Sequence, residues 1–424
     1  MRSSCRILEC TTRVCNTGPV SALLPPLRYD LDAMPSPVED RPGLLMRDSL
    51  HYSDAVLIIP PPLVECLSCF DGQHTELDLR AMLVKLTGDF QVGDLERNLI
   101  DTLKQSGFLQ DETFAAMKEA RQREFAESPV REAAHAGSGY PDNPEELRRQ
   151  MNEWMGALET FEDDLIGIAA PHVSPQGGYE SYRAAYGLLG PNYKDRTFVI
   201  LGTSHYGAPE RFGLTRKPYA TPWGNAQTDT ALVDELTRLA PAGVGSEDYC
   251  QSVEHSIEFQ VVYLQSIFGP DIRILPILCG SYAQSIYRGG KPEDNEGVAR
   301  FLGALGEIAA REGNRLLWVL GIDMAHMGRR YGDRFEAIAE EREMIVVDAR
   351  DRARMDRVAA GDATGFWDLV QENHDDLKWC GSSPLYTFLK VVPQARGSLK
   401  RYEQWNIDPQ SVVSFAGMSF RVGA

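Results

Sequence analysis

The stretch Leu165–His172 reads LIGIAAPH, a short apolar run that ends in a proline and a histidine. Thr197–Leu201 and Leu316–Leu320 are runs of the same kind, rich in Ile, Val and Leu and each followed by a glycine. Strands that are buried on both faces have this composition, because helices cover both sides of a parallel sheet. The three runs therefore predict an α/β fold around a mainly parallel sheet.

Two further runs, Ile272–Cys279 and Val412–Phe420, have the composition of additional strands in this sheet. The amphipathic segments expected to form crossover helices are Ala231–Leu239, Gly297–Arg311, Phe335–Ala349 and Phe366–Asn373. Alternation of strands and helices is typical of a sheet with helices on both faces. We expect this α/β domain to occupy residues 156–424.

The overall composition narrows the class of protein. The chain has 424 residues, 43% of them hydrophobic, and a formal net charge of −18 at pH 7. This length suits roughly two or three domains, and the acidic charge argues against nucleic acid as a partner. No apolar run approaches the roughly 18–20 residues that span a bilayer, and no secretory signal follows Met1. We expect a cytoplasmic protein with reduced cysteines and no membrane partner.

Three regions precede the α/β domain. Residues 1–40 contain several prolines and no hydrophobic period, which predicts a disordered tail. Residues 41–113 are expected to form a small winged-helix-like α+β module, and residues 114–155 a charged helical linker. The elements expected in the module are a strand at Leu57–Ile59, helices at Pro62–Cys69, Leu77–Leu86 and Val92–Ser106, and a strand that begins at Gly107.

Two motifs of this module carry a resemblance. Phe70–Thr75 reads FDGQHT before a helix, and Leu103–Leu109 ends in Gly-Phe-Leu. In both motifs, the module resembles the PqqD-like domains. These domains bind the leader peptides of ribosomally made, modified peptides. The resemblance implies that the module recruits a peptide or protein substrate. A DNA-binding winged helix is the alternative, but acidic residues outnumber basic ones in Val92–Ser106, which disfavours contact with phosphates.

A histidine stands at or just beyond an apolar run at four places, His172, His205, His255 and His326. Ligands of open α/β sheets bind beyond the carboxyl ends of the strands, so these histidines point to one shared site. His172 and His205 are the expected metal ligands, and Cys380 is the third candidate, because a helix N-terminus favours its thiolate. Taken singly, each of these residues also fits a structural role; only their joint pattern favours a metal site.

Four residues are candidates for catalysis. Asp323 stands three residues before His326, a spacing that lets the carboxylate orient the imidazole for proton transfer. His255 and Glu258 are also three apart, at the start of a predicted helix, so both are expected to face the same cavity. There His255 would donate a proton or hold the substrate. A second possibility is a hydrolase in which Cys380, His326 and Asp323 form a triad.

Five motifs, in order, carry a second resemblance: Ala-Pro-His-x₄-Gly-Gly-Tyr, Leu-Gly-Thr-Ser-His, Glu-His-Ser-Ile-Glu, Asp-Met-Ala-His-Met-Gly and Cys-Gly-Ser-Ser-Pro. They resemble the Memo family, which includes protein B of the AmmeMemoRadiSam system and shares its fold with the LigB-type class III extradiol dioxygenases. The resemblance implies that His172, His205 and Cys380 bind a divalent metal. Iron is the expected metal, and copper or zinc are the alternatives. It implies an acid–base role for Asp323 and His326, and a radical SAM partner protein.

The resemblance makes a metal-dependent redox enzyme, related to the extradiol dioxygenases, the first hypothesis of function. The dioxygenases place a carboxylate where this chain has Cys380, and this softer ligand weakens the inference of ring cleavage. Val173, Tyr206 and Gln260 also depart from the usual Memo pattern, which leaves the small-molecule or peptide substrate open. The alternative functions are a peptide-binding adaptor that keeps a dioxygenase-like pocket and the cysteine hydrolase.

Overall fold

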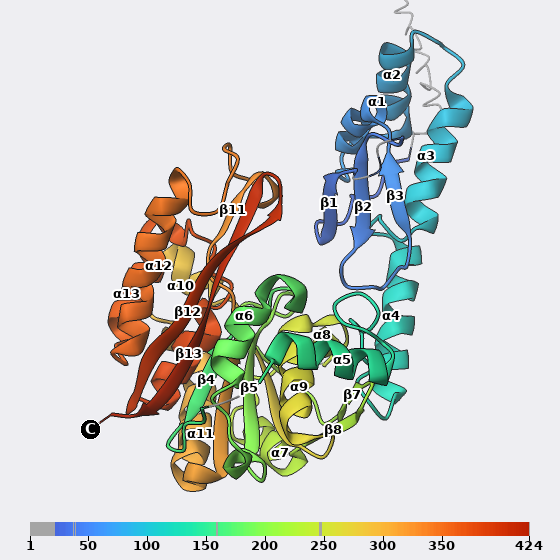
Figure 1. Cartoon of the computed structure of the whole chain (residues 1–424). Helices are drawn as coiled ribbons and strands as arrows, with labels where there is room; N and C mark the ends of the chain where they lie inside the picture. The colour runs from blue at the N-terminus through green and yellow to red at the C-terminus, as the bar shows by residue number, and fades with distance from the viewer. Residues whose placement is uncertain (1–21, 37, 39, 158–159, 246–247, 424) are drawn as a thin grey trace, which may run out of the picture. The chain divides into compact units, whose positions relative to one another are not determined.

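The computed structural model describes residues 22–36, 38, 40–157, 160–245 and 248–423 (Figure 1). The chain divides into two compact units, Met1–Arg121 and Gln122–Ala424. Helix α4 (Glu112–Glu127) begins in the first unit and ends in the second. In the described part of the chain, no helix is long and apolar enough to cross a membrane.

The first unit contains an antiparallel sheet in the order β1-β2-β3. Its elements are β1 (Leu31–Pro35), β2 (Leu44–Asp48), β3 (Val56–Ile59), α1 (Pro61–Val64), the 3₁₀ helix η1 (Glu65–Cys69), α2 (Glu76–Thr87) and α3 (Gly93–Gln105). Thr75 begins α2 with a capping box, in which its side chain and that of Asp78 each bind the other's backbone amide. Leu79 and Leu103 are fully buried in the core between the helices.

Two features of this unit differ from the sequence-based expectation. Strand β1 lies inside the stretch 1–40 that we expected to be disordered, and Leu24 is buried in the core. Prolines do not prevent this, because β1 is an edge strand, where a missing amide donor is tolerated. Residues 1–21 of the expected tail lie outside the described residues. The strand expected from Gly107 is reduced to an isolated bridge between Leu109 and Leu27.

The second unit is built on a sheet of ten strands, ordered β11-β13-β4-β10-β5-β9-β8-β7, with β12 paired to β13 and β6 to β9. The parallel strands are β4 (Gly167–Ala170), β10 (Leu316–Gly321), β5 (Thr197–Thr203), β9 (Arg273–Cys279) and β8 (Gly224–Thr228). The antiparallel strands are β6 (Phe212–Leu214), β7 (Tyr219–Thr221), β11 (His326–Gly328), β12 (Ala395–Asp408) and β13 (Ser411–Val422). The predicted mainly parallel α/β fold is confirmed, whereas β6, β7, β8, β11 and β12 were not predicted.

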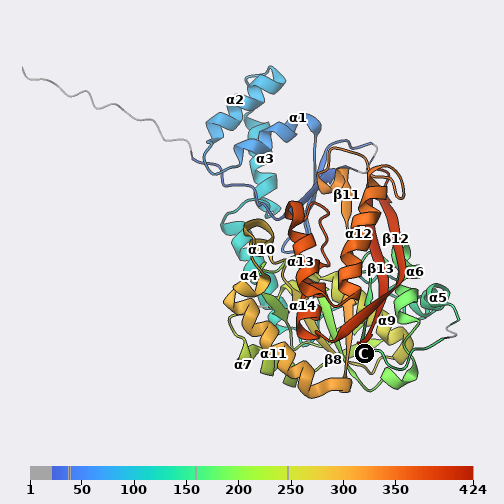
Figure 2. The ribbon, with the colours of Figure 1, turned by 90° about the vertical axis from the view of Figure 1, so that its left-hand side faces the viewer.

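Helices cover both faces of this sheet (Figures 1 and 2). In β5, Phe198 and Ile200 pack into one core and Val199 and Leu201 into the other, because neighbouring side chains of a strand point to opposite faces. One core also contains side chains of α5 (Pro144–Met155), α6 (Pro175–Tyr186) and α9 (His255–Phe268). The other contains side chains of α7 (Thr230–Leu239), α11 (Glu296–Glu312), α12 (Glu343–Ala359), α13 (Ala363–Gln371) and α14 (Ser382–Val391). The short helices are α8 (Cys250–Val253), α10 (Ala283–Arg288), η2 (Pro191–Tyr193), η3 (Pro292–Asp294), η4 (Gly313–Arg315), η5 (Arg329–Tyr331) and η6 (Glu372–His374).

Two boundaries in the second unit also differ from expectation. The helix expected at Phe335–Ala349 begins only at Glu343 of α12, because Glu340 and Arg342 have left-handed φ angles of 64° and 47°. Much of the expected linker 114–155 belongs to the second unit, where Leu147 and Met151 of α5 are buried. The second unit therefore begins at Gln122, before the expected start at residue 156, and the buried side of α5 belongs to its core.

Candidate metal centre

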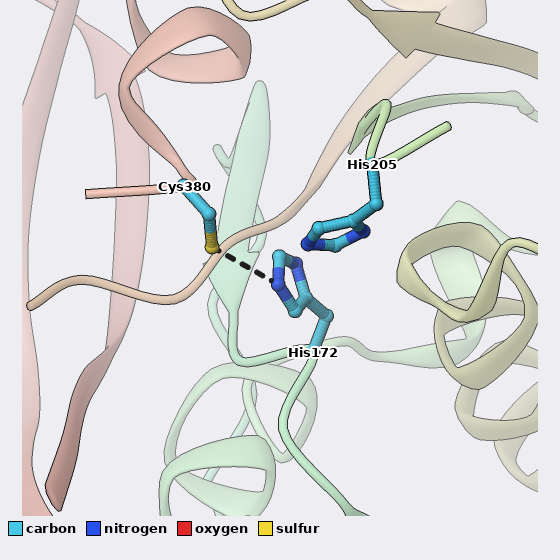
Figure 3. A group of neighbouring side chains, drawn as sticks. All are labelled: His172, His205 and Cys380. Atoms are coloured by element: carbon cyan, nitrogen blue, oxygen red, sulfur yellow. Dashed lines mark hydrogen bonds between the residues drawn. The ribbon is translucent and has the colours of Figure 1, made fainter. Parts of the chain in front are cut away.

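Three side chains from distant segments meet beyond the carboxyl ends of β4 and β5 (Figure 3). His172 follows β4, His205 follows β5, and Cys380 stands just before α14. One ligand atom from each lies within 4.8 Å of the other two, and Sγ of Cys380 is 3.1 Å from Nε2 of His172. The structure thus brings together the three residues that the sequence analysis named as metal ligands.

The ring of His172 has a defined orientation. Its Nδ1–H donates to the carbonyl oxygen of Gly321, at the end of β10, over 2.9 Å. Strands β10 and β4 are neighbours in the sheet, with Gly321 paired to Ala170, so the backbone of one strand orients a ligand on the next. This hydrogen bond leaves Nε2 as the ring nitrogen that faces Cys380.

His205 is oriented by a buried carboxylate that the sequence analysis did not select. Its Nδ1–H donates to Oε1 of Glu254 over 2.9 Å, and its backbone N–H donates to Oε2 of the same residue, also over 2.9 Å. Glu254 is fully buried and caps the N-terminus of α9 by accepting from the backbone N–H of Ser256. A carboxylate that holds the outer nitrogen of a histidine is a common support for a metal ligand.

Charges at the site favour ionised side chains. Burial by itself raises the pKa of the Cys380 thiol, but the positive charges of His172 and His326 and hydrogen bonds from His172 and His205 lower it to about 5. Burial lowers the pKa of His172, but the charges of Cys380 and Asp323 raise it to about 9. Without a metal, a thiolate and an imidazolium therefore face each other at neutral pH.

Glu254 and His205 form a second ionised pair. Burial raises the pKa of Glu254, but the charges of His205 and His255 and hydrogen bonds from His205 hold it well below its usual range. Burial lowers the pKa of His205, but Glu254 and Cys380 raise it well above the ordinary value. The buried carboxylate of Glu254 is therefore ionised and remains hydrogen-bonded to His205 at neutral pH.

The pair predicted from the spacing of Asp323 and His326 does not form. Oδ1 of Asp323 accepts from the backbone N–H groups of His172 and Val173 over 2.9 and 3.1 Å. Nδ1–H of His326 donates instead to the carbonyl oxygens of Met324 and Lys378, over 2.9 and 3.1 Å. Asp323 thus shapes the turn that carries His172, and the backbone orients His326. The predicted Cys380–His326–Asp323 triad lacks the contact between its last two members.

Glu258 also has a role other than the predicted one. It is fully buried and forms an ion pair with Arg131, and it accepts hydrogen bonds from Tyr140 and from the backbone N–H of His135. Its carboxylate is therefore engaged by the segment before α5 instead of serving beside His255. The reason lies in the tertiary structure. The segment 131–140, part of the expected linker, contributes the buried guanidinium of Arg131, which forms an ion pair with Glu258.

Arg131 holds the start of α9 in place. Beyond its ion pair with Glu258, its guanidinium donates to the carbonyl oxygens of Gln251 and Glu254 over 2.8 and 2.7 Å and lies 4.9 Å from the ring centroid of Tyr219. Arg131 thereby fixes the backbone of the residue that orients His205. Sequence reasoning missed it, since a single arginine in a charged segment carries no local signal of burial.

His255 lies beside the three candidate ligands and adds a third imidazole to the site. Its ring stacks on that of His205, with centroids 4.9 Å apart and planes inclined by 13°, and lies 5.2 Å from that of His172. Burial, together with the charges of His205 and His172, holds its pKa well below the ordinary value despite Glu254. His255 is therefore neutral at pH 7, so the expected role of proton donor is wrong, and the role of holding a substrate stays a prediction.

Comparison with known proteins places this site in a family. The family model of "Memo-like protein" matches residues 131–419. A "MEMO1 family protein" of Aquifex aeolicus is 26% identical over 381 residues, 89% of this chain and 95% of the relative. A relative of the same description from Methanosarcina mazei is 25% identical over 68% of this chain and 98% of its own length. One from Thermus thermophilus is 27% identical over 62% of this chain and 74% of its own length.

These matches differ in how much of the chain they include. The Aquifex match is longer than the second unit and so includes part of the first. The PqqD-like character of the first unit stays a prediction. The family model, by contrast, spans almost all of the second unit, including every residue of the candidate metal centre. The chain therefore belongs to the Memo family.

Proposed function

We propose that this protein is a metal-dependent redox enzyme whose metal is held by His172, His205 and Cys380. The observation that carries the proposal is the convergence of two imidazole nitrogens and one thiolate sulfur within 4.8 Å of one another. Iron is the first candidate and copper the redox-active alternative; zinc suits the same ligands but would supply no electron transfer.

The donor set fits such a metal. Protein nitrogen and sulfur ligands bind zinc at about 2.0–2.3 Å, and iron and copper at similar distances, so the 3.1 Å between Sγ of Cys380 and Nε2 of His172 suits one shared ion. A thiolate with two imidazoles favours iron, copper or zinc over magnesium or calcium. Three protein ligands leave coordination positions open for a substrate, which is typical of catalytic sites.

The surrounding residues supply proton transfer and orientation. A bound iron or copper would contribute one-electron chemistry that no side chain here provides. His255 is stacked on His205 and neutral, so it can hold a substrate at the site by a hydrogen bond, while its lowered pKa makes it a weak proton acceptor. His326 keeps Nε2 free because its Nδ1–H is held by two backbone carbonyls, and it is the candidate for proton transfer.

The first unit would recruit a peptide or protein substrate. Its sheet has β1 and β3 at its two edges, and an extended peptide can add to such an edge as a further strand. This part of the proposal also relies on the resemblance to PqqD-like domains. A radical SAM partner protein is proposed on the family resemblance alone.

Metal analysis tests the proposal. The full chain, purified without oxygen, should retain about one equivalent of iron, copper or zinc, and His172→Ala should abolish retention. His74→Ala is the matched control, because His74 is exposed in the first unit, pairs with Asp71 and does not belong to the group of ligand atoms. Equal metal content in all three proteins, or none in the unmodified chain, would reject the metal centre.

The two alternative functions make different predictions. A peptide-binding adaptor would bind peptide equally well after His172, His205 and Cys380 are all replaced by alanine. A cysteine hydrolase would turn over substrate without metal, and the short contact between Cys380 and His172 favours the thiolate that it needs. Loss of all activity in the metal-free protein, restored by adding metal, would exclude both.

A further inference from the structure

The loop that leads to Cys380 has an unusual backbone. Asn373, His374, Asp375 and Lys378 have φ angles of 54°, 57°, 53° and 55°, in the left-handed region. Residues other than glycine are rare there, and asparagine, aspartate and histidine are the partly favoured exceptions. A loop with this conformation keeps its shape only where other contacts hold it.

Arg354 of α12 supplies one set of these contacts. Its guanidinium is 2.7 Å from Oδ1 of Asp375, and the side chains of the two residues are only 2% and 10% exposed. The same group donates to the carbonyl oxygen of Leu369 over 2.9 Å and lies 5.3 Å from the ring centroid of Trp379. Arg354 thus binds the loop at the residue just before Cys380 and at Asp375.

Asp351, one turn earlier on the same helix, supplies a second set. Nε1–H of Trp379 donates to Oδ1 of Asp351 over 2.6 Å. Oδ2 accepts from Ser414 over 2.6 Å, and Oγ of Ser414 accepts the backbone N–H of Ala325 over 2.9 Å. Asp351 therefore links the Cys380 loop to the turn between Asp323 and His326.

We propose that Asp351 and Arg354 are positioning residues that set where the Cys380 sulfur lies relative to His172 and His205. The proposal rests on the proposed metal centre and deepens it. Neither residue belongs to the group of ligand atoms; Asp351 acts through Trp379, and Arg354 acts through Asp375 and Trp379.

The two histidines depend on other supports. The ring of His172 is oriented by the backbone of Gly321 and that of His205 by Glu254, and neither hydrogen bond involves Arg354 or Trp379. Releasing the loop should therefore move the sulfur and leave the imidazoles in place. The expected defect is a selective loss of sulfur ligation, which general destabilisation would not produce.

The test is a cobalt(II) titration of the full chain with the variant Arg354→Met. Co(II) bound to a thiolate shows a sulfur-to-metal charge-transfer band in addition to its ligand-field bands, so sulfur and histidine ligation are read separately. We expect the charge-transfer band to weaken and cobalt affinity to fall about 10–100-fold, the usual range for residues that support metal ligands. Arg357→Met is the control, because Arg357 is exposed on the same helix and pairs with Asp362, outside the loop.

A second variant covers the case in which Arg354→Met fails to fold. Trp379→Phe keeps an aromatic ring and removes the N–H that binds Asp351, so it should also weaken the charge-transfer band. The proposal is overturned if either folded variant binds cobalt through sulfur as tightly as the Arg357→Met control. A failure of the metal centre itself looks different, since the unmodified chain would then show no charge-transfer band.

Discussion

Sγ of Cys380 lies 3.1 Å from Nε2 of His172, although 208 positions separate the two residues in the chain. The contact exists because β4 and β10 are parallel neighbours: His172 follows the first strand, and the turn after the second contacts the Cys380 loop. The backbone N–H of Gly381 donates to the carbonyl oxygen of Asp323 over 3.0 Å, which joins that loop to the turn. The reactivity of the thiol, the binding of metal and the stability of the site follow from this arrangement.

In the metal-free protein, Cys380 should react as a thiolate far below the usual pH. Its pKa of about 5 means that alkylation by iodoacetamide should reach half its maximal rate near pH 5, against about 8.5 for an ordinary thiol. His172→Ala removes the largest favourable charge and should move the midpoint upward. Mass spectrometry of the peptide that contains Cys380 measures the rate, and a midpoint near 8.5 in the unmodified protein would contradict the prediction.

Metal affinity should rise with pH up to about 9. His172 and His205 have raised pKa values, that of His172 to about 9, so at neutral pH a metal must displace a proton from each. Cys380 is already a thiolate above about pH 5 and releases none. At pH 7, calorimetry in buffers of different ionisation enthalpy should therefore show release of about two protons per metal. Affinity that is constant between pH 6.5 and 9 would contradict this.

Glu254→Gln should weaken metal binding without unfolding the protein. The amide keeps the shape of the side chain but loses the charge that holds His205, so affinity should fall about 10–100-fold. Glu296→Gln is the matched control, because Glu296 is exposed and pairs with Arg300 on α11, so the Glu254 carboxylate and its contact with His205 stay in place. Competition with a coloured chelator measures the affinity, and equal affinity in Glu254→Gln and the unmodified protein would refute the role of Glu254.

Arg131→Met should destabilise the second unit strongly. The variant leaves Glu258 buried without its cation, which costs about 3–5 kcal/mol in buried ion pairs. Arg300→Met breaks an exposed pair with Glu296 and should cost about 0–1 kcal/mol. Urea unfolding followed by circular dichroism compares the two free energies. Equal stability of the two variants would show that the Arg131–Glu258 pair does not hold the start of α9.

Local pattern made much of the second unit predictable. The five apolar runs named from the sequence correspond to β4, β5, β9, β10 and β13. Strands β6, β7, β8 and β11 were missed, and so was β12, whose side chains are mostly partly buried or exposed and include Arg396, Lys400 and Arg401. Such a strand lacks the continuous apolar run that marks a buried one, and its pairing with β13 defines it instead.

The sequence by itself determined which residues could bind a metal, because histidines at strand ends and a cysteine before a helix depend only on local pattern. The tertiary structure decided which side chains support these candidate ligands. Asp323 supports the His172 turn instead of His326, Glu254 holds His205, and Arg131 captures Glu258. The physical reason is that hydrogen bonds and ion pairs between distant segments depend on distance and burial in space, which spacing along the chain does not encode.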